Sequence, residues 1–499
     1  MSLTLIVIGI AIYIVTSVVV ATWSRSGSTS SMSDYFIGGR SMGGLVSALS
    51  YSATTYSAFM MVGLAGLTYK GGVGALGFEI VYFAGVSLVA IFGPRFWAVG
   101  RKYGFVTPSE MLGARYGSRW VAMAAAVASC IFLVPYCAVQ LAGVGYLLSG
   151  MSDGAISFGV GIVVATILAI AFSYIAGIRS VMWTDSLQAV VMIVASVAVV
   201  GFVVSELGGL SGLFDAVEAK NAKMLTVPGP GLFSFTTFLG LTIPWFFFAI
   251  SNPQVSQRLY MPATLGAMRR MLLIFLVFGF IYTIVSVLWG FSAFVAFPDL
   301  ENADLATSTL LASDLVPPVL GVIVMIGILA AAVSTIDSIL LTLSSMVARD
   351  VYANVASRND DQRQLMIGKI VIPLISLVAL GFAAMQFSLI AVLAVAASTG
   401  LVVIVPSIVG AFFWKGGTAA GALASIIGGG AFVIVMYLTG NSLWGLNAGI
   451  LGLPVSAILF VVASLATKTN ENRAAEFIRE ADFAMKYRRG PAGEAKLTG

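Results

Sequence analysis

Long apolar stretches and short polar connections alternate along almost the whole chain. Each stretch is about 20 residues long, which is the length that an α-helix needs to cross the hydrocarbon core of a bilayer. The pattern therefore predicts an all-α integral membrane protein with about 13 transmembrane helices. The expected spans are 3–22, 43–67, 72–98, 119–149, 155–176, 181–203, 232–251, 270–297, 317–346, 367–386, 388–413, 418–439 and 446–467.

The domain organisation follows from the same pattern. Residues 1–467 are expected to form a single transmembrane domain, because no polar stretch between spans is long enough for a soluble domain. Residues 468–499 mix basic and acidic side chains and are expected to be a cytoplasmic C-terminal tail that forms a fraying helix.

The distribution of basic residues predicts the orientation. With these spans, one set of connections holds only Lys70, Lys220 and Lys223, whereas the other set and the tail hold the remaining 23 of the 26 Lys and Arg residues. Because cytoplasmic loops carry the excess of Lys and Arg, the N-terminus is expected outside and the C-terminus in the cytoplasm.

Composition agrees with a membrane protein and excludes several function classes. Of all residues, 59% are hydrophobic and 9% are charged, whereas soluble domains carry about 25% charged residues. The net charge of +5 is spread over short connections, so no nucleic-acid partner is expected. The chain has no histidine, and no GxxxxGK[ST] loop, which argues against ATP-driven pumping. Neither an enzyme nor an organic cofactor is expected.

The span 317–346 contains a stripe of small and hydroxyl-bearing residues. Ala331, Ser334, Thr335 and Ser338 follow the i, i+3, i+4, i+7 spacing of one helix face, and Asp337 flanks them. Sodium, a hard cation, prefers oxygen ligands such as these. The alternative is tight helix packing, in which the hydroxyl groups bond to carbonyls of their own helix.

Two other spans carry features of interrupted helices. Residues 50–57 hold five Ser or Thr hydroxyl groups at the centre of a span, and the span 232–251 holds Gly240 and Pro244, of which the proline lacks a backbone donor. Broken helices at matching places in two halves indicate an inverted repeat, with the binding site between the halves. The repeats would cover about 43–203 and 232–413. A locally bent but continuous helix remains the alternative for residues 50–57.

Acidic residues within spans are functional candidates, because burying a charge in a membrane is costly. Three occur, at Glu79, Asp185 and Asp337. Other side chains that suit the lining of a solute pocket, or ordinary helix packing, are Tyr136, Gln140, Trp245 and Phe248.

Six sequence blocks, in this order, make the chain resemble the sodium:solute symporter family. They are SDYFIGGRSMGG at 33–44, LSYSATTYS at 49–57, TPSEMLGARYG at 107–117, SYIAGIRSVMWTDSLQ at 173–188, PQVSQRL at 253–259 and AAAVSTIDSILLTLSSMVARDVY at 330–352. The resemblance implies a LeuT-like bundle of five plus five helices in inverted repeat, one helix preceding the repeats.

The resemblance also implies site residues. A first sodium site would use carbonyls of Ala53, Tyr56 and Ala331 with hydroxyls of Ser334 and Thr335. A second site, found in some members, would use Asp185 and Ser338, with Asp337 where the family has a hydroxyl. Pocket positions of the family correspond to Ser57, Glu79, Tyr136 and Trp245, and Thr55 stands where proline carriers have an aspartate.

The function expected is sodium-coupled import of a small organic solute, with Na⁺ as the coupling ion, across the plasma membrane. A carboxylate-bearing solute such as an amino acid, a monocarboxylate or pantothenate is favoured. The alternatives are a proton-coupled symporter, with Asp337 or Glu79 as proton carrier, and a sensor built on a transporter scaffold. The sequence leaves the solute, the number of ions and the oligomeric state open.

Overall fold

The computed structural model describes residues 2–24, 31–356, 360–386, 389–440 and 442–486. These ranges contain helices and two isolated β-bridges, Met42 with Pro262 and Leu443 with Leu446, but no strand. The all-helical class predicted from the sequence is therefore confirmed for the described part of the chain.

The N-terminal half of the bundle begins with a single long helix and then becomes interrupted. Its elements are α1 (Leu3–Ser24), α2 (Met32–Ile37), η1 (Gly38–Arg40), α3 (Gly44–Thr55), η2 (Phe59–Leu64), α4 (Ala65–Gly71), α5 (Gly74–Gly85), α6 (Ser87–Tyr103), α7 (Pro108–Tyr116), α8 (Arg119–Met151), α9 (Phe158–Glu206), α10 (Gly209–Asn221) and η3 (Ala222–Leu225).

The C-terminal half contains a second set of long and interrupted helices. They are α11 (Phe235–Phe246), α12 (Phe248–Ser251), α13 (Pro253–Ser256), η4 (Gln257–Tyr260), α14 (Leu265–Ala296), η5 (Ala303–Leu305), α15 (Ala306–Ala312), α16 (Pro318–Met346), η6 (Val347–Tyr352), α17 (Ala353–Ala356), α18 (Asp361–Ala384), α19 (Ile390–Leu401), η7 (Val402–Ile404), α20 (Val405–Phe413), α21 (Ala419–Leu423), η8 (Ala424–Gly428), α22 (Gly429–Thr439), α23 (Ala448–Leu465) and α24 (Glu471–Lys486).

Within the described residues, 10 helices are long and apolar enough to cross a membrane. Three other expected spans take a different form. The span expected at 43–67 is interrupted between α3 and η2, and those expected at 155–176 and 232–251 contain the shorter apolar helices Phe158–Tyr174 and Phe235–Phe246. The expected total of about 13 spans therefore remains a prediction.

The spans expected at 155–176 and 181–203 are joined without a loop. They form α9, whose helical geometry is interrupted at Gly177, where φ is 60° and ψ is 178°. Glycine adopts this conformation without the clash of a Cβ atom, and a Cβ here would lie 3.0 Å from the ring of Tyr35. The sequence expectation placed a connection here, and the structure replaces it with one glycine that redirects the helix.

The polar segment at 50–57 is a genuine interruption rather than a bent helix. Helix α3 ends at Thr55, and Tyr56 has φ −94° and ψ 70°, outside the helical region. The chain resumes at Phe59 as η2, a π-helix, and the Ser57 hydroxyl accepts a hydrogen bond from the Phe59 N–H at 3.3 Å. The continuous-helix alternative is therefore wrong.

The second expected interruption lies close to Pro244. Helix α11 ends at Phe246, the short α12 follows, and Asn252 then has an extended backbone with φ −84° and ψ 114°. Both interrupted segments face the interior of the bundle, because Ser52, Ala53, Trp245 and Phe248 are all buried.

Helix α16 lies at the centre of the bundle. Every residue from Gly327 to Met346 is buried, and the helix packs against α3, α8 and α9.

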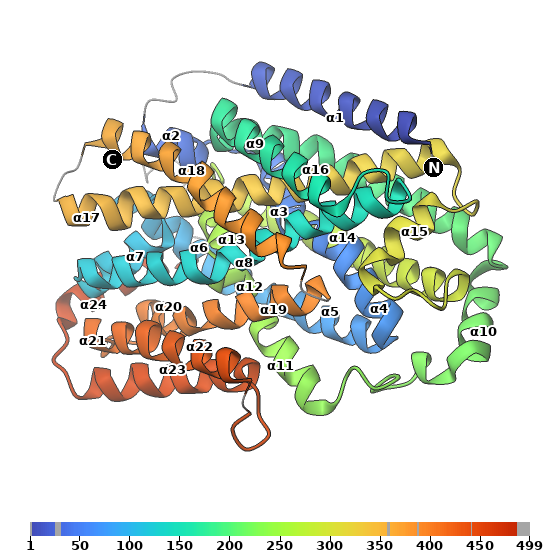
Figure 1. The fold of residues 1–499 in the computed structure, drawn as a ribbon. Coiled ribbons are helices and arrows are strands. Elements are labelled where there is room, and N and C mark those ends of the chain that lie inside the picture. Colours follow the sequence, from blue (N-terminus) through green and yellow to red (C-terminus); the bar gives the residue numbers. More distant parts are fainter. Residues whose placement is uncertain (1, 25–30, 357–359, 387–388, 441, 487–499) are drawn as a thin grey trace.

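Different elements lie at the two ends of the bundle. Helix α10 and the start of α1 lie at one end, and α7, α17 and α24 lie at the other (Figure 1).

Helix α24 packs against the bundle instead of fraying as the tail was expected to do. Arg95 and Asp482 form an ion pair at 3.0 Å, and the rings of Tyr103 and Phe477 stack with centroids 6.0 Å apart. The start of the C-terminal tail is thus tied to the end of α6.

The predicted orientation can be tested by labelling single cysteines. Lys220 on α10 and Glu471 on α24 are both exposed. In a Cys130→Ala, Cys137→Ala background, a membrane-impermeant maleimide added to intact cells should label Lys220→Cys and should label Glu471→Cys only after permeabilisation. Equal labelling of Glu471→Cys in intact cells would contradict a cytoplasmic C-terminus.

Candidate functional site

The interrupted helix α3 faces the hydroxyl stripe of α16 at Thr335. The Thr335 Oγ1 atom donates to the Ala331 carbonyl at 3.0 Å and lies 3.3 Å from the Thr54 carbonyl and 3.4 Å from the Ala53 carbonyl. A hydroxyl group has one hydrogen to donate, so it cannot satisfy three carbonyl oxygens. This gathering of oxygen atoms suits a hard cation.

Of the five residues expected at the first sodium site, the structure brings Ala53, Ala331 and Thr335 together. Tyr56 lies directly at the break, and its ring stacks on Phe275 with centroids 5.1 Å apart. Ser334 is buried, and its hydroxyl lies beside the Asp185 carboxyl.

A buried arginine binds two of the residues expected at a second ion site. Arg258 in η4 forms an ion pair with Asp185 of α9 at 3.2 Å, and its guanidinium also donates to Ser50 of α3 and Ser338 of α16. The Ser50 hydroxyl donates to Asp185 at 2.6 Å. The positive charge of the guanidinium thus joins α3, α9 and α16.

Asp337 takes no part in this arginine cluster. Its Oδ1 atom accepts a hydrogen bond from Ser173 of α9 at 3.0 Å, and it has no ion-pair partner among the described residues. The expected set of Asp185, Asp337 and Ser338 is therefore divided between two groups of contacts.

The residues expected to line a solute pocket gather around Trp245. Its ring centroid lies 4.8 Å from that of Phe248, and the Phe248 ring contacts the Tyr136 ring with centroids 5.7 Å apart. The rings of Phe59 and Tyr82 lie 4.8 and 5.5 Å from that of Trp245. Helices α5, α8, α11 and α12 and the π-helix η2 thus contribute to one aromatic cluster.

Buried polar groups accompany these rings. The Tyr82 hydroxyl and both amide atoms of Gln140 have no hydrogen-bond partner, whereas the Glu79 carboxyl lies beside the Trp245 indole nitrogen and the Tyr136 hydroxyl lies beside Ser57. Buried polar atoms are normally hydrogen bonded. Unpartnered donors and acceptors beside a ring cluster are what a site for a small polar ligand requires.

Sequence reasoning missed Arg258 and Tyr82 at these clusters. Arg258 was counted with the basic residues of a cytoplasmic connection, since its sequence neighbours do not reveal its burial. Tyr82 follows Glu79 by three residues and so shares its helix face, which is a signal that could have identified it.

The chain is similar to known proteins over most of its length. Residues 35–429 match the family model described as "Sodium:solute symporter family". The sodium/pantothenate symporter of Escherichia coli (strain K12) is 28% identical over 468 residues, which cover 92% of this chain and 94% of that protein. The sodium/proline symporter of Staphylococcus aureus (strain JH9) is 25% identical over 500 residues, 94% of this chain and 96% of that protein.

Solved structures show the same fold. The substrate-bound outward-open state of a Na⁺-coupled sialic acid symporter superposes with a TM-score of 0.78 at 20% identity, over 93% of this chain and 98% of that one. MhsT in complex with L-phenylalanine gives a TM-score of 0.51 at 15% identity, over 85% and 98%. The fold is therefore that of LeuT-like transporters, and the chain belongs to the sodium:solute symporter family of multi-pass plasma-membrane transporters.

Proposed function

We propose that this protein imports a small carboxylate-bearing solute (an amino acid, a monocarboxylate or pantothenate) and that one Na⁺ binds where α3 is interrupted beside α16. The observation that carries the ion assignment is Thr335 Oγ1, which lies within 3.4 Å of three carbonyl oxygens. In the proposed site the cation is held by the carbonyls of Ala53, Tyr56 and Ala331 and the hydroxyls of Ser334 and Thr335.

The solute is proposed to bind at the aromatic cluster around Trp245. The polar groups that would orient it are those of Ser57, Glu79, Tyr136 and Gln140, and the rings that would enclose it are those of Trp245 and Phe248. Ser57 and Tyr56 are adjacent in the chain, so an ion bound at the break would also fix the backbone beside the solute. This proximity gives a physical reason for coupling ion and solute binding.

The set Asp185, Asp337 and Ser338 remains a prediction for a second sodium site. The Arg258 guanidinium competes for it, because it already binds Asp185 and Ser338. We propose that the contacts of Arg258 hold α3, α9 and α16 together on the cytoplasmic side while the solute site is open to the other side. Opening toward the cytoplasm would then require these contacts to break.

Uptake by proteoliposomes tests the function directly. With an imposed inward sodium gradient, one of the radiolabelled amino acids, short monocarboxylates or pantothenate should accumulate, and gramicidin should abolish the accumulation because it dissipates the gradient. Accumulation that follows a pH gradient and ignores sodium would contradict the proposal and favour proton coupling through Asp337 or Glu79.

Thr335→Ala tests the ion ligand. Removing one hydroxyl contact to a charged group costs about 1.5–3 kcal/mol, so the sodium concentration for half-maximal uptake should rise roughly tenfold or more. Thr166→Ala on α9 is a matched control, because that hydroxyl is also buried and bonds to its own helix at Ile162. An unchanged sodium dependence in Thr335→Ala would remove Thr335 from the site.

Arg258→Gln tests the buried ion pair. The variant leaves the Asp185 charge buried without its partner, which costs about 3–5 kcal/mol, and the melting temperature of the purified protein should fall clearly. The double variant Arg258→Gln, Asp185→Asn should recover part of the loss, since it removes the unpaired charge as well. If the double variant lost as much as the two single variants added together, the pair would not be coupled.

A further inference from the structure

A wide apolar groove lies between α8 on one side and α21, η8 and α22 on the other. Its volume is about 550 Å³, within the range of about 300–1,000 Å³ that is usual for small-molecule sites. Every side chain that lines it is apolar, and Val127, Ile131 and Ile427 are also exposed. The groove therefore opens on the outer surface of the bundle, which in a membrane faces hydrocarbon.

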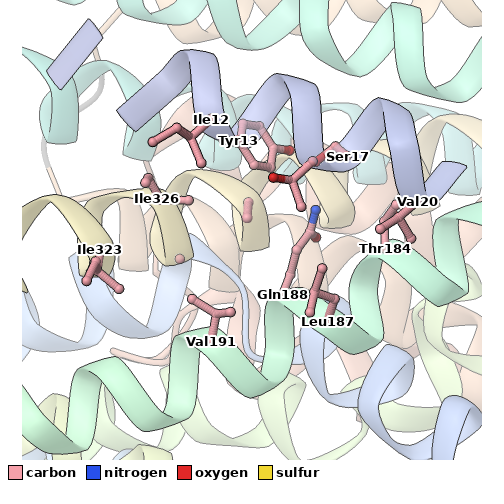
Figure 2. A pocket seen from close by; sticks show the side chains of 13 residues that line it. Ile12, Tyr13, Ser17, Val20, Thr184, Leu187, Gln188, Val191, Ile323 and Ile326 are labelled. Carbon is pink, nitrogen blue, oxygen red and sulfur yellow. The ribbon is translucent and has the colours of Figure 1, made fainter. Parts of the chain in front are cut away.

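The groove differs in chemistry from a second cavity, of about 200 Å³, between α1, α9 and α16. Figure 2 shows the side chains of Tyr13, Ser17 and Gln188 pointing toward one another in that cavity. Polar groups at membrane depth need polar partners. The groove beside α8 presents no such demand from its lining residues, and so it is the better fit for a hydrocarbon chain.

Contacts deeper in the bundle hold the two walls of the groove. On one wall, the π-helix η8 turns the Ser425 hydroxyl toward η7, where it donates to the Val403 carbonyl at 2.8 Å. On the other wall, the Phe132 ring packs on α19 so closely that a Cβ atom at Gly400 would overlap it. Gly430 supplies no side chain between the walls, and a Cβ atom there would meet only Phe132, at 3.7 Å.

The length of the groove corresponds to one leaflet of a bilayer. Trp120 and Phe132 both line it and are twelve residues apart on α8, which is roughly 18 Å along a helix. Half of a hydrocarbon core is about 15 Å thick. Trp120 is exposed at the beginning of α8, and tryptophan is enriched at the membrane–water interface. The groove therefore runs from the interface to about the middle of the bilayer.

A basic side chain lies at the interfacial end of the groove. The guanidinium carbon of Arg119 lies 5.3 Å from the centroid of the Trp120 ring. Arg119 is exposed and takes no part in the ion pairs of the described residues. A guanidinium binds phosphate with two parallel hydrogen bonds. Helix α8 begins directly after α7, at the end of the bundle predicted to face the cytoplasm, where anionic lipids carry negative charge.

We propose that this groove binds one acyl chain of an anionic phospholipid whose phosphate group is bound by Arg119. The proposal is independent of the solute and of the coupling ion. It commits to a phospholipid because the apolar walls, the length of one leaflet and the unpaired guanidinium at the mouth match the two parts of that molecule. A bound chain would contact Phe132 and so would stabilise the packing of α8 against α19.

Native mass spectrometry of the purified full-length protein, titrated with phosphatidylglycerol, tests the proposal. The unmodified protein should retain one lipid per chain. Gly430→Leu should abolish this binding, because the new side chain fills the groove, and leucine favours the helix over glycine. Arg119→Gln should weaken the binding on the order of tenfold, because it removes charge-assisted hydrogen bonds to the phosphate.

Two matched controls should bind as the unmodified protein does. Gly381→Leu makes the same change at an exposed glycine of α18 that has no atom near its Cβ position. Arg270→Gln removes an exposed arginine of α14, which does not line the groove. Inorganic phosphate alone should not displace the lipid, since it lacks the acyl chain.

Several outcomes would overturn the proposal. If Gly430→Leu retains phosphatidylglycerol with unchanged affinity, the groove is not the site. If phosphatidylcholine binds as tightly as phosphatidylglycerol and Arg119→Gln binds both unchanged, no anionic headgroup is recognised. The same spectra report the oligomeric state, so a dimer that Gly430→Leu converts to a monomer would assign the groove to a second copy of the chain instead of a lipid.

Discussion

The hydrocarbon core of a membrane offers no partner for a free backbone N–H or C=O group, so an interrupted helix is stable only where it lies inside the protein. This constraint explains the centre of the bundle. Helix α3 ends at Thr55 among buried residues, and the carbonyls of Ala53 and Thr54 meet Thr335 on the most central helix, α16. Because the break is buried, its carbonyl oxygens lie inside the bundle, where a sodium ion would bind them.

Charged side chains inside the bundle also need partners. Asp185 and Arg258 are both fully surrounded by protein, and each would be costly without the other. Their pairing leaves Asp337 as a second carboxylate in the same region with a hydroxyl as its described partner. Arg258 therefore neutralises Asp185 and leaves Asp337 without an ion-pair partner among the described residues.

Helix α1 has two different faces. It precedes the inverted repeats implied by the family resemblance, and much of its surface is exposed, including Val15, Val19 and Trp23. The opposite face carries Tyr13 and Ser17, which are buried against α9 and α16. These two residues bring hydroxyl groups to the packing surface that α1 shares with α9 and α16.

The sequence by itself determined the membrane class, the approximate spans, the break near Tyr56 as one of two alternatives, and the hydroxyl stripe of α16. These features arise from apolar periodicity and helix spacing, which are local. Tertiary structure alone decided that Gly177 joins two spans, that Arg258 reaches Asp185 and Ser338, and that Thr335 meets the carbonyls of Ala53 and Thr54. The partners in each case come from segments far apart in the chain, such as η4 with α9 or α1 with α16, and no local pattern encodes which of them meet.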